Sequence, residues 1–319
     1  MFKWLKRRLL ALLCSAVLSA IVGAVYEQAA DARDAKRFHT PGRLVDIGGG
    51  RKMSLDCRGA GLPAVILETG LGGLGITWKD VMKGVEPLTR VCSYDRAGYG
   101  YSDAGPLPRT SNLIAEDLEK LLAAANEKGP YILVGHSFGG MNIRVFNARN
   151  KQDVAGLIFV DSSHPEQFNR FPASVRRKQN IVNWVLRGVL PLNRIGVVRA
   201  ALAWTSNYDD ELTFRVTQPK FGQAYMSELD SLLESGRQTS AASPTLGDQP
   251  IIVLTAGKDG TGTPELYKMW REEFQPELVR MSTRSKQYVV EGSTHLIPIE
   301  KPQAVVDAIR EMLAGIKQS

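Results

Sequence analysis

The pattern of apolar and polar residues divides the chain near residue 40. Before that point, Lys3, Lys6, Arg7 and Arg8 precede an uncharged apolar stretch, Leu9–Tyr26. After it, short apolar runs alternate with helical patterns. The predicted strands are Leu44–Ile47, Lys52–Cys57, Ala64–Glu68, Val91–Tyr94, Tyr131–Val134, Leu157–Asp161, Ile251–Thr255 and Lys286–Val290, and the predicted helices are Ser111–Asn126, Gly140–Asn150, Glu265–Glu273 and Pro302–Ile316. This alternation predicts an α/β fold with a mostly parallel sheet covered by helices on both faces.

The apolar stretch 9–26 predicts a membrane anchor. As a helix its 18 residues reach roughly 27 Å, close to the thickness of a hydrocarbon core. Trp4 and Tyr26 lie at its ends, where aromatic rings favour the interface. The basic flank 1–8 is then expected in the cytoplasm, with a linker or short helical stalk over 27–43 and the rest outside. The alternative is a cleaved signal peptide and a secreted protein, although signal peptides usually have apolar segments of only about 7–15 residues.

Residues 162–249 separate the sixth and seventh predicted strands by almost ninety residues, far more than an ordinary connection. We expect a helical cap or lid there, inserted between the core segments 44–161 and 250–319, because open α/β sheets bind ligands at the carboxyl ends of their strands. Residues 170–199 contain seven basic residues and no acid. Two interpretations stay open: solvated helix faces, or a basic surface near anionic lipid.

The amino-acid composition and charge exclude several classes of protein. The chain of 319 residues is 44% hydrophobic and 23% charged with 3 Cys, which excludes a disordered, collagenous or disulfide-rich protein. Residues 1–40 hold seven Lys/Arg against three Asp/Glu, which accounts for +4 of the net charge of +7. The remaining charge gives no reason to expect nucleic acid as a partner. No metal-ligand spacing, phosphate loop or dinucleotide motif is present, so no cofactor and no metal are expected.

The strongest chemical signal is the segment Tyr131–Gly140, in which an apolar strand runs into Gly135–His–Ser137–Phe–Gly139 and then into a predicted helix. A G-x-S-x-G turn between strand and helix is so sharp that side chains at the two glycines would clash with neighbouring backbone. It lifts the serine above the sheet at a helix N-terminus. Ser137 is therefore the predicted nucleophile. His136 is interpreted as a packing or turn residue.

Three motifs together resemble the α/β-hydrolase superfamily, in its serine-nucleophile, esterase-like branch. Besides the Ser137 turn, Leu67–Gly73 resembles the family's oxyanion loop, and Asp95–Ser102 resembles its D-x-x-G-x-G-x-S loop. The resemblance covers about residues 44–316. It implies the α/β-hydrolase fold, with eight strands and a helical cap between strands six and seven. Thr69–Gly70 stands where many relatives have His-Gly, which changes the support of the loop but not its backbone donors.

The resemblance also implies the partners of Ser137. His295, after the last predicted strand, matches the position of the family's base, and His164 is the weaker candidate. The acid is expected between the serine and the histidine in chain order. Asp259, after the seventh predicted strand, is the preferred acid, and Asp161, which ends the sixth, is the alternative.

The oxyanion hole is expected to combine the backbone N–H groups of Leu71 and Phe138. The glycines of the 95–102 loop are interpreted as forming a tight turn, with a bracing role for Arg96 as the alternative. In this family the strands that carry Cys57 and Cys92 are antiparallel neighbours. A disulfide and two buried thiols both remain possible for these cysteines.

These residues predict a membrane-anchored serine hydrolase that cleaves an ester or related acyl bond of a hydrophobic, lipid-like or other small-molecule substrate. Carbon–carbon bond hydrolysis, thioesterase, amidase and perhydrolase activities use the same three residues and stay open. A non-catalytic binding protein on this fold is the second class, since fold does not imply function.

Overall fold

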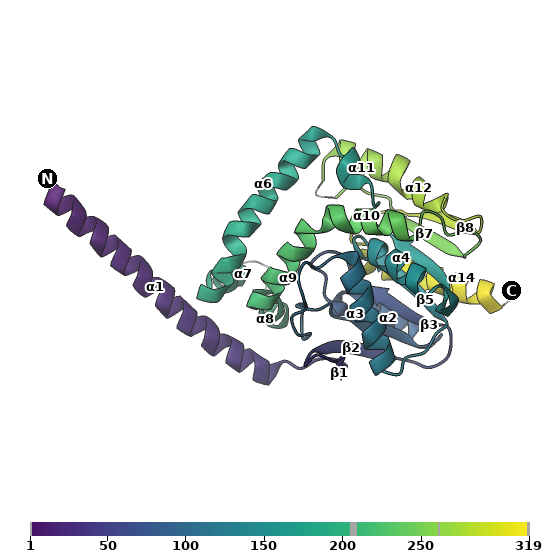
Figure 1. Cartoon of the computed structure of the whole chain (residues 1–319), viewed down its shortest axis with the longest axis horizontal. Coiled ribbons are helices and arrows are strands. Elements are labelled where there is room, and N and C mark those ends of the chain that lie inside the picture. Colours follow the sequence, from purple (N-terminus) through teal and green to yellow (C-terminus); the bar gives the residue numbers. More distant parts are fainter. Residues whose placement is uncertain (1, 205–208, 261, 318–319) are drawn as a thin grey trace. The chain divides into compact units, whose positions relative to one another are not determined.

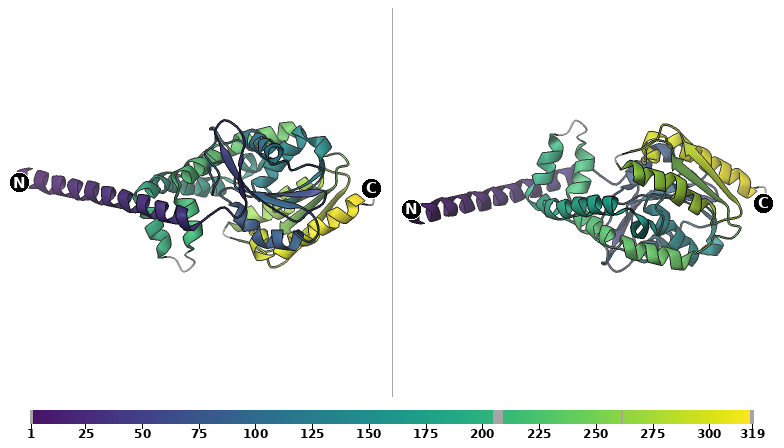
Figure 2. Two further views of the ribbon diagram at one scale, coloured as in Figure 1. Left: turned by 90° about the horizontal axis from the view of Figure 1, so that it is seen from below. Right: turned by 90° about the horizontal axis from the view of Figure 1, so that it is seen from above.

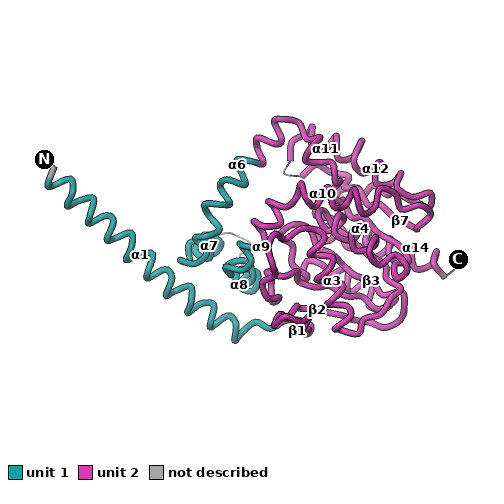
Figure 3. Tube along the Cα trace, in the orientation of Figure 1, with its two compact units in different colours: residues 1–39, 180–223 teal, residues 40–179, 224–319 magenta. Residues whose placement is uncertain are grey.

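The computed structural model describes residues 2–204, 209–260 and 262–317. They fall into two compact units (Figure 3): residues 1–39 with 180–223, and residues 40–179 with 224–319. The first is called the anchor unit below and the second the sheet unit. The predicted cap, 162–249, is divided between them, because its middle part packs with the N-terminal helix.

The sheet unit contains one eight-stranded sheet with the order β1-β2-β4-β3-β5-β6-β7-β8 (Figure 1). The β1–β2 and β2–β4 pairs are antiparallel, and the other pairs are parallel. The strands are β1 (Arg43–Asp46), β2 (Lys52–Arg58), β3 (Ala64–Glu68), β4 (Val91–Tyr94), β5 (Tyr131–His136), β6 (Val154–Val160), β7 (Ile251–Ala256) and β8 (Ser285–Val290). All eight predicted strands are confirmed, with β6 beginning three residues early.

Helices cover both faces of this sheet. On one face, α3 (Ser111–Ala124), α4 (Gly139–Arg149) and α12 (Gln275–Val279) share an apolar cluster with strand residues such as Ile66 and Leu133. On the other, α2 (Lys79–Val85), α13 (Ile297–Glu300) and α14 (Pro302–Lys317) pack on Val65 and Val134. Successive residues of a buried parallel strand point to opposite faces, which explains why the strands are apolar at nearly every position.

The described residues between β6 and β7 are largely helical, as predicted. They contain α5 (Gln167–Arg170), α6 (Ala173–Val189), η3 (Leu190–Ile195), α7 (Val197–Ala203), α8 (Asp210–Thr217), α9 (Pro219–Asp230) and α10 (Leu232–Ala242). Further short elements are η1 (Gly75–Trp78), η2 (Lys151–Asp153), α11 (Pro264–Met269) and the π-helix η4 (Trp270–Phe274).

The anchor unit is built on α1 (Phe2–Arg37), which is continuous through the predicted linker as far as Arg37 (Figure 2). Pro41 and Gly42 follow shortly after, and a proline cannot continue a helix. By length and composition α1 could cross a membrane, with a mean hydropathy of 2.4 over its most apolar window. Its C-terminal part carries acidic residues that bind α7, as described below.

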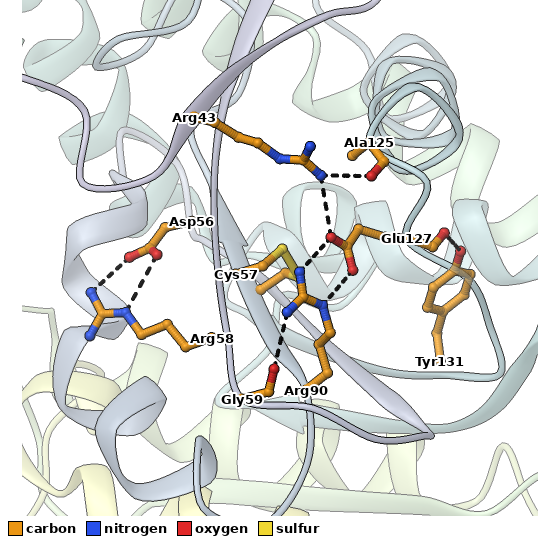
Figure 4. The surroundings of a disulfide bond; sticks show 10 residues. Arg43, Asp56, Cys57, Arg58, Gly59, Arg90, Ala125, Glu127 and Tyr131 are labelled. Atoms are coloured by element: carbon orange, nitrogen blue, oxygen red, sulfur yellow. Dashed lines mark hydrogen bonds and ion pairs between the residues drawn. A yellow bond between two sulfur atoms is a disulfide. The ribbon is translucent and has the colours of Figure 1, made fainter.

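A disulfide joins Cys57 of β2 to Cys92 of β4 (Figure 4). The two residues face each other directly across the antiparallel pair, with Cα atoms 4.1 Å apart. Beside the bond, the Glu127 carboxylate accepts hydrogen bonds from Arg90 at 2.6 and 2.7 Å. Because both sulfurs are engaged, the Cys57–Cys92–Glu127 cluster does not offer thiolate ligands to a metal.

We expect alkylation of the unfolded, unreduced chain to modify Cys14 alone, since it is the free cysteine. Reduction before alkylation should add two further modified thiols. Intact-mass spectrometry measures both numbers, and three modified thiols without reductant would contradict the disulfide.

Candidate active site

Ser137 lies in the turn between β5 and α4, and its backbone has a φ of +52°. The flanking glycines are required there. A Cβ at Gly135 would lie 2.7 Å from the Gly139 carbonyl oxygen, and one at Gly139 would lie 2.6 Å from the Glu68 carbonyl oxygen. The backbone N–H of Ser163 donates to the Ser137 carbonyl at 2.9 Å, which ties the turn to the chain after β6. The predicted sharp turn is therefore present.

His295 lies between β8 and α13, and its Nδ1 is 2.6 Å from Oδ2 of Asp161. Asp161 follows β6 directly and is 1% exposed, and its Oδ1 accepts the backbone N–H of Ala256 at 2.9 Å. A carboxylate at Nδ1 selects the tautomer with its proton on Nδ1. That leaves Nε2 of His295 able to accept a proton.

The structure does not bring the preferred acid, Asp259, to His295. The Asp259 carboxylate is 48% exposed and pairs with Arg271, whose Nη2 lies 2.6 Å from its Oδ1. The structure instead brings the alternative, Asp161, to His295. The physical reason is placement: Asp161 continues a buried central strand next to the nucleophile strand, whereas Asp259 lies in the loop beyond β7.

His136 supports the loop that carries His295. Its Nε2 donates to the His295 carbonyl oxygen at 2.8 Å, and the two rings lie 4.8 Å apart. Burial, with a smaller contribution from the neighbouring His295, lowers the pKa of His136 to about 3. A neutral imidazole held in this way is a structural element, as the sequence predicted. Because His136 directly precedes Ser137, it also places the His295 loop beside the nucleophile turn.

His164 has neighbours that differ from those of His295. It stacks on Phe274 with ring centroids 5.2 Å apart, and its Nε2 lies 3.1 Å from Glu277. Burial lowers its pKa to about 4, although Glu277 opposes the shift. It makes no contact with Asp161 among the described residues, so it is the weaker base candidate here as well.

The predicted oxyanion loop lies against the Ser137 turn. A Cβ at Gly70 would lie 3.0 Å from the Ser137 Cβ and 3.1 Å from His136 Nδ1. The next residue, Leu71, packs in the same apolar cluster as Phe138. Among the described residues, the backbone N–H groups of Leu71 and Phe138 donate no hydrogen bond. These are the two groups expected to bind an oxyanion.

Arg96 fixes the carbonyl groups of this loop. Its side chain is 1% exposed and donates to the Thr69 carbonyl at 2.8 Å and the Gly70 carbonyl at 2.7 Å. It also pairs with Glu68 and Glu228, each at 2.8 Å. Burial alone would lower the pKa of Arg96, but the two carboxylates outweigh it and raise that pKa well above its usual value. Arg96 therefore braces the loop, which was the alternative interpretation of the 95–102 segment. The tight glycine turn is present as well, with Gly98 and Gly100 at positive φ.

The second carboxylate, Glu228, comes from α9 and is completely buried. It accepts both Nε and Nη2 of Arg96 and the hydroxyl of Tyr99. One turn earlier, the ring of Tyr225 covers Gly72 of the oxyanion loop, where a Cβ would lie 2.8 Å from it. One face of α9 therefore supports the loop through both residues.

Sequence reasoning missed Glu68 and Glu228. Glu68 had a detectable signal, since an acid that ends a fully apolar strand needs a buried partner. Burial raises its pKa, and Arg96 opposes that shift. Glu228 had none, because it lies on a helix far from Arg96 in the chain and resembles any surface glutamate.

Comparison with known proteins identifies the family of the chain. The family model described as "Alpha/beta hydrolase family" matches residues 65–308, which is most of the chain. The chain belongs to the alpha/beta hydrolase family. The expected family and fold are both confirmed.

Individual similar proteins support the fold and do not indicate a substrate. The chain is 29% identical to a protein of Hormonema carpetanum named "Probable transporter efuK" over 85% of this chain and 42% of that one. It spans less than half the length of several curated relatives. An esterase of Thermogutta terrifontis has a TM-score of 0.60 at 21% identity, covering 86% of this chain and 97% of that one. A putative lipase of Acinetobacter baumannii has a TM-score of 0.65 at 19% identity, covering 86% and 91%.

We expect Asp161→Asn to lower kcat for ester hydrolysis by about four orders of magnitude, since an amide at Nδ1 of His295 favours the wrong imidazole tautomer. Asp259→Asn is the matched control and should leave kcat nearly unchanged. Steady-state kinetics on an activated aryl ester measures both. The opposite ranking would restore Asp259 as the acid.

We expect Glu228→Gln to lower the free energy of unfolding by on the order of 3 kcal/mol, because it removes one charge of a buried ion pair. It should also lower kcat more than it raises KM, since the oxyanion loop loses its support. Glu234→Gln, on the exposed side of α10, is the control. Chemical denaturation and kinetics measure the two effects, and a variant as stable and active as Glu234→Gln would contradict the bracing role.

Proposed function

We propose that the chain is a serine hydrolase that cleaves an ester or related acyl bond of a hydrophobic substrate through an acyl-enzyme intermediate. The observation that carries the proposal is the Asp161–His295 pair, held by His136 next to the Ser137 turn. A buried carboxylate, an imidazole and a serine at a strand-to-helix turn are the parts that nucleophilic acyl transfer needs.

In the proposed reaction, the Ser137 Oγ attacks the carbonyl carbon while Nε2 of His295 takes the hydroxyl proton. Asp161 stabilises the imidazolium cation. The tetrahedral intermediate collapses, the bond to the leaving alcohol breaks, and His295 gives that alcohol its proton. Water then attacks the acyl-enzyme by the same route, with His295 taking a proton from water and returning it to Ser137. The products are a carboxylic acid and an alcohol.

The N–H groups of Leu71 and Phe138 are the proposed oxyanion donors. The negative oxygen develops only in the transition state, so donors fixed in advance lower the barrier. Removing one such donor typically costs ~2.7–4 kcal/mol. Arg96 fixes the position of the Leu71 donor, because it binds the two carbonyl groups that precede Leu71.

Apolar side chains around the turn support a hydrophobic substrate. One cluster contains Phe138 and Met141, with Leu71 packed against it. A second contains Phe171, Trp270 and Phe274, and the Trp270 ring lies 5.8 Å from that of His295. Phe168 packs against both clusters. Leu71 and Phe168 are only partly buried, and they are the side chains of these clusters that an acyl chain or an aryl group would contact.

Carbon–carbon bond hydrolysis, thioester, amide and perhydrolysis activities use the same three residues and are the alternatives. An epoxide hydrolase or haloalkane dehalogenase on this fold uses an aspartate nucleophile, and Ser137 occupies that position here. A non-catalytic binding protein would have no need of the Asp161–His295 pair.

We also propose that α1 anchors the enzyme in a membrane, with residues 1–8 in the cytoplasm and the sheet unit on the other side. No residue of the apolar window of α1 is buried, and α1 is basic before that window. A disulfide also fits an extracytoplasmic location. Cleavage after α1 and secretion is the alternative.

The test is labelling of the full chain with a fluorophosphonate probe. Labelling should be present in the wild type and abolished in Ser137→Ala and His295→Ala, because an unactivated serine does not react. His164→Gln is the control histidine variant and should label normally. Labelling that persists in Ser137→Ala would contradict the assigned nucleophile, and a folded wild type that does not label would favour the binding protein.

A further inference from the structure

The anchor unit has an apolar groove beside the predicted membrane helix. The groove has a volume of about 570 Å³ and is lined by Leu18, Val22 and Tyr26 of α1 and by Ile195, Val197 and Ala200. The contact is close: a Cβ at Gly23 would lie 2.3 Å from the Ile195 carbonyl oxygen. A residue larger than glycine would push this part of the chain away from α1.

The position of this contact along α1 determines how deep the segment around Ile195 would lie in a bilayer. Leu18, Val22 and Gly23 all lie within the uncharged stretch 9–26. Leu18 is eight residues before the end of that stretch, or about 12 Å along a helix. If α1 lies in a bilayer, the segment around Ile195 that packs on it lies at or below the headgroup level.

A buried charge cluster holds this segment in place. Arg199 of α7, which is 3% exposed, bonds Glu27 at 3.0 Å, Asp31 at 2.8 Å and Asp34 at 2.6 Å. The three acids lie on successive turns of α1, just beyond the apolar stretch. Charges leave water in this way only when paired, so the cluster fixes α7 against the end of the membrane helix.

Residues 181–204 carry many exposed large apolar side chains. They are Ile181, Val182, Trp184, Val185, Val189, Leu192, Val197 and Trp204, with Trp184 76% and Trp204 92% exposed. An exposed patch of this kind on a soluble protein marks an interaction site. The same segment, 180–204, has no acidic residue and three arginines, of which Arg187 and Arg194 are exposed and Arg199 belongs to the buried charge cluster.

We propose that residues 181–204 form a second membrane-contacting surface, which lies in the interface of the leaflet from which α1 emerges. Its apolar side chains enter the acyl region, its exposed arginines face anionic phosphate groups, and the groove holds an acyl chain of a bilayer lipid. Amphipathic segments with tryptophan on one side and arginine on the other bind bilayers in this way. The proposal rests on α1 lying in the bilayer, and it does not depend on the hydrolase chemistry.

The test uses the full chain with Cys14→Ala, reconstituted in phosphatidylcholine vesicles with and without phosphatidylglycerol. Single cysteines replace Trp184, Leu12 of α1 or Leu107 of the sheet unit, all three exposed, and carry an environment-sensitive fluorophore. Lipids with a nitroxide on the upper acyl chain quench a label only when it lies in the bilayer. Circular dichroism checks that each variant is folded.

We expect the label at 184 to reach at least half of the quenching at 12, and the label at 107 to show almost none. Omitting phosphatidylglycerol should weaken quenching at 184 but not at 12. Quenching at 184 no greater than at 107 would overturn the proposal, as would an unquenched label at 12. Equal quenching at 184 in both lipid mixtures would overturn the role given to the arginines. A failure here leaves the fluorophosphonate result unaffected, so the two proposals fail separately.

Discussion

The geometry of the site depends on the hydrogen bonds that the buried guanidinium group of Arg96 donates. Arg96 joins the end of β3, the loop after β4 and helix α9 at one point, and it binds the two carbonyl groups before Leu71. A loop that must present N–H groups to a transient charge has to keep its carbonyl groups turned away from the site, and a cation behind them does this. Two carboxylates offset the cost of burying that cation, and the hydroxyls of Tyr94 and Tyr99 satisfy their remaining acceptor sites.

The nucleophile side has a matching arrangement of hydrogen bonds. The Ser137 turn is held between Gly70 and the chain after β6, and Asp161 and His136 fix the two ends of His295, its ring and its backbone carbonyl. Each functional group is thus positioned by a neighbour from a different strand. Parallel strands make this possible because their carboxyl ends meet at one edge of the sheet.

The sequence predicted the parts of this fold that depend on local pattern. The strands were predictable because buried parallel strands are continuously apolar, and the sharp turn at Ser137 was predictable because only glycines fit beside it. The contact of Asp161 rather than Asp259 with His295 was not predictable, since chain order allows either residue. The partnership of Arg96 with Glu228 joins residues 132 apart in the chain, and no local pattern encodes it. The association of 180–223 with α1 was missed for the same reason.

The central claim is that the loop held by Arg96 presents the N–H group of Leu71, and the Ser137 turn that of Phe138, to the oxyanion formed at Ser137. A crystal structure of the full chain after reaction with a phosphonate tests this most directly, because the phosphonyl group imitates the tetrahedral intermediate. The account predicts phosphorus bonded to the Ser137 Oγ, with the phosphonyl oxygen within hydrogen-bonding distance of both N–H groups and Arg96 unmoved. An adduct on another residue, or a phosphonyl oxygen directed away from Leu71 and Phe138, would contradict it.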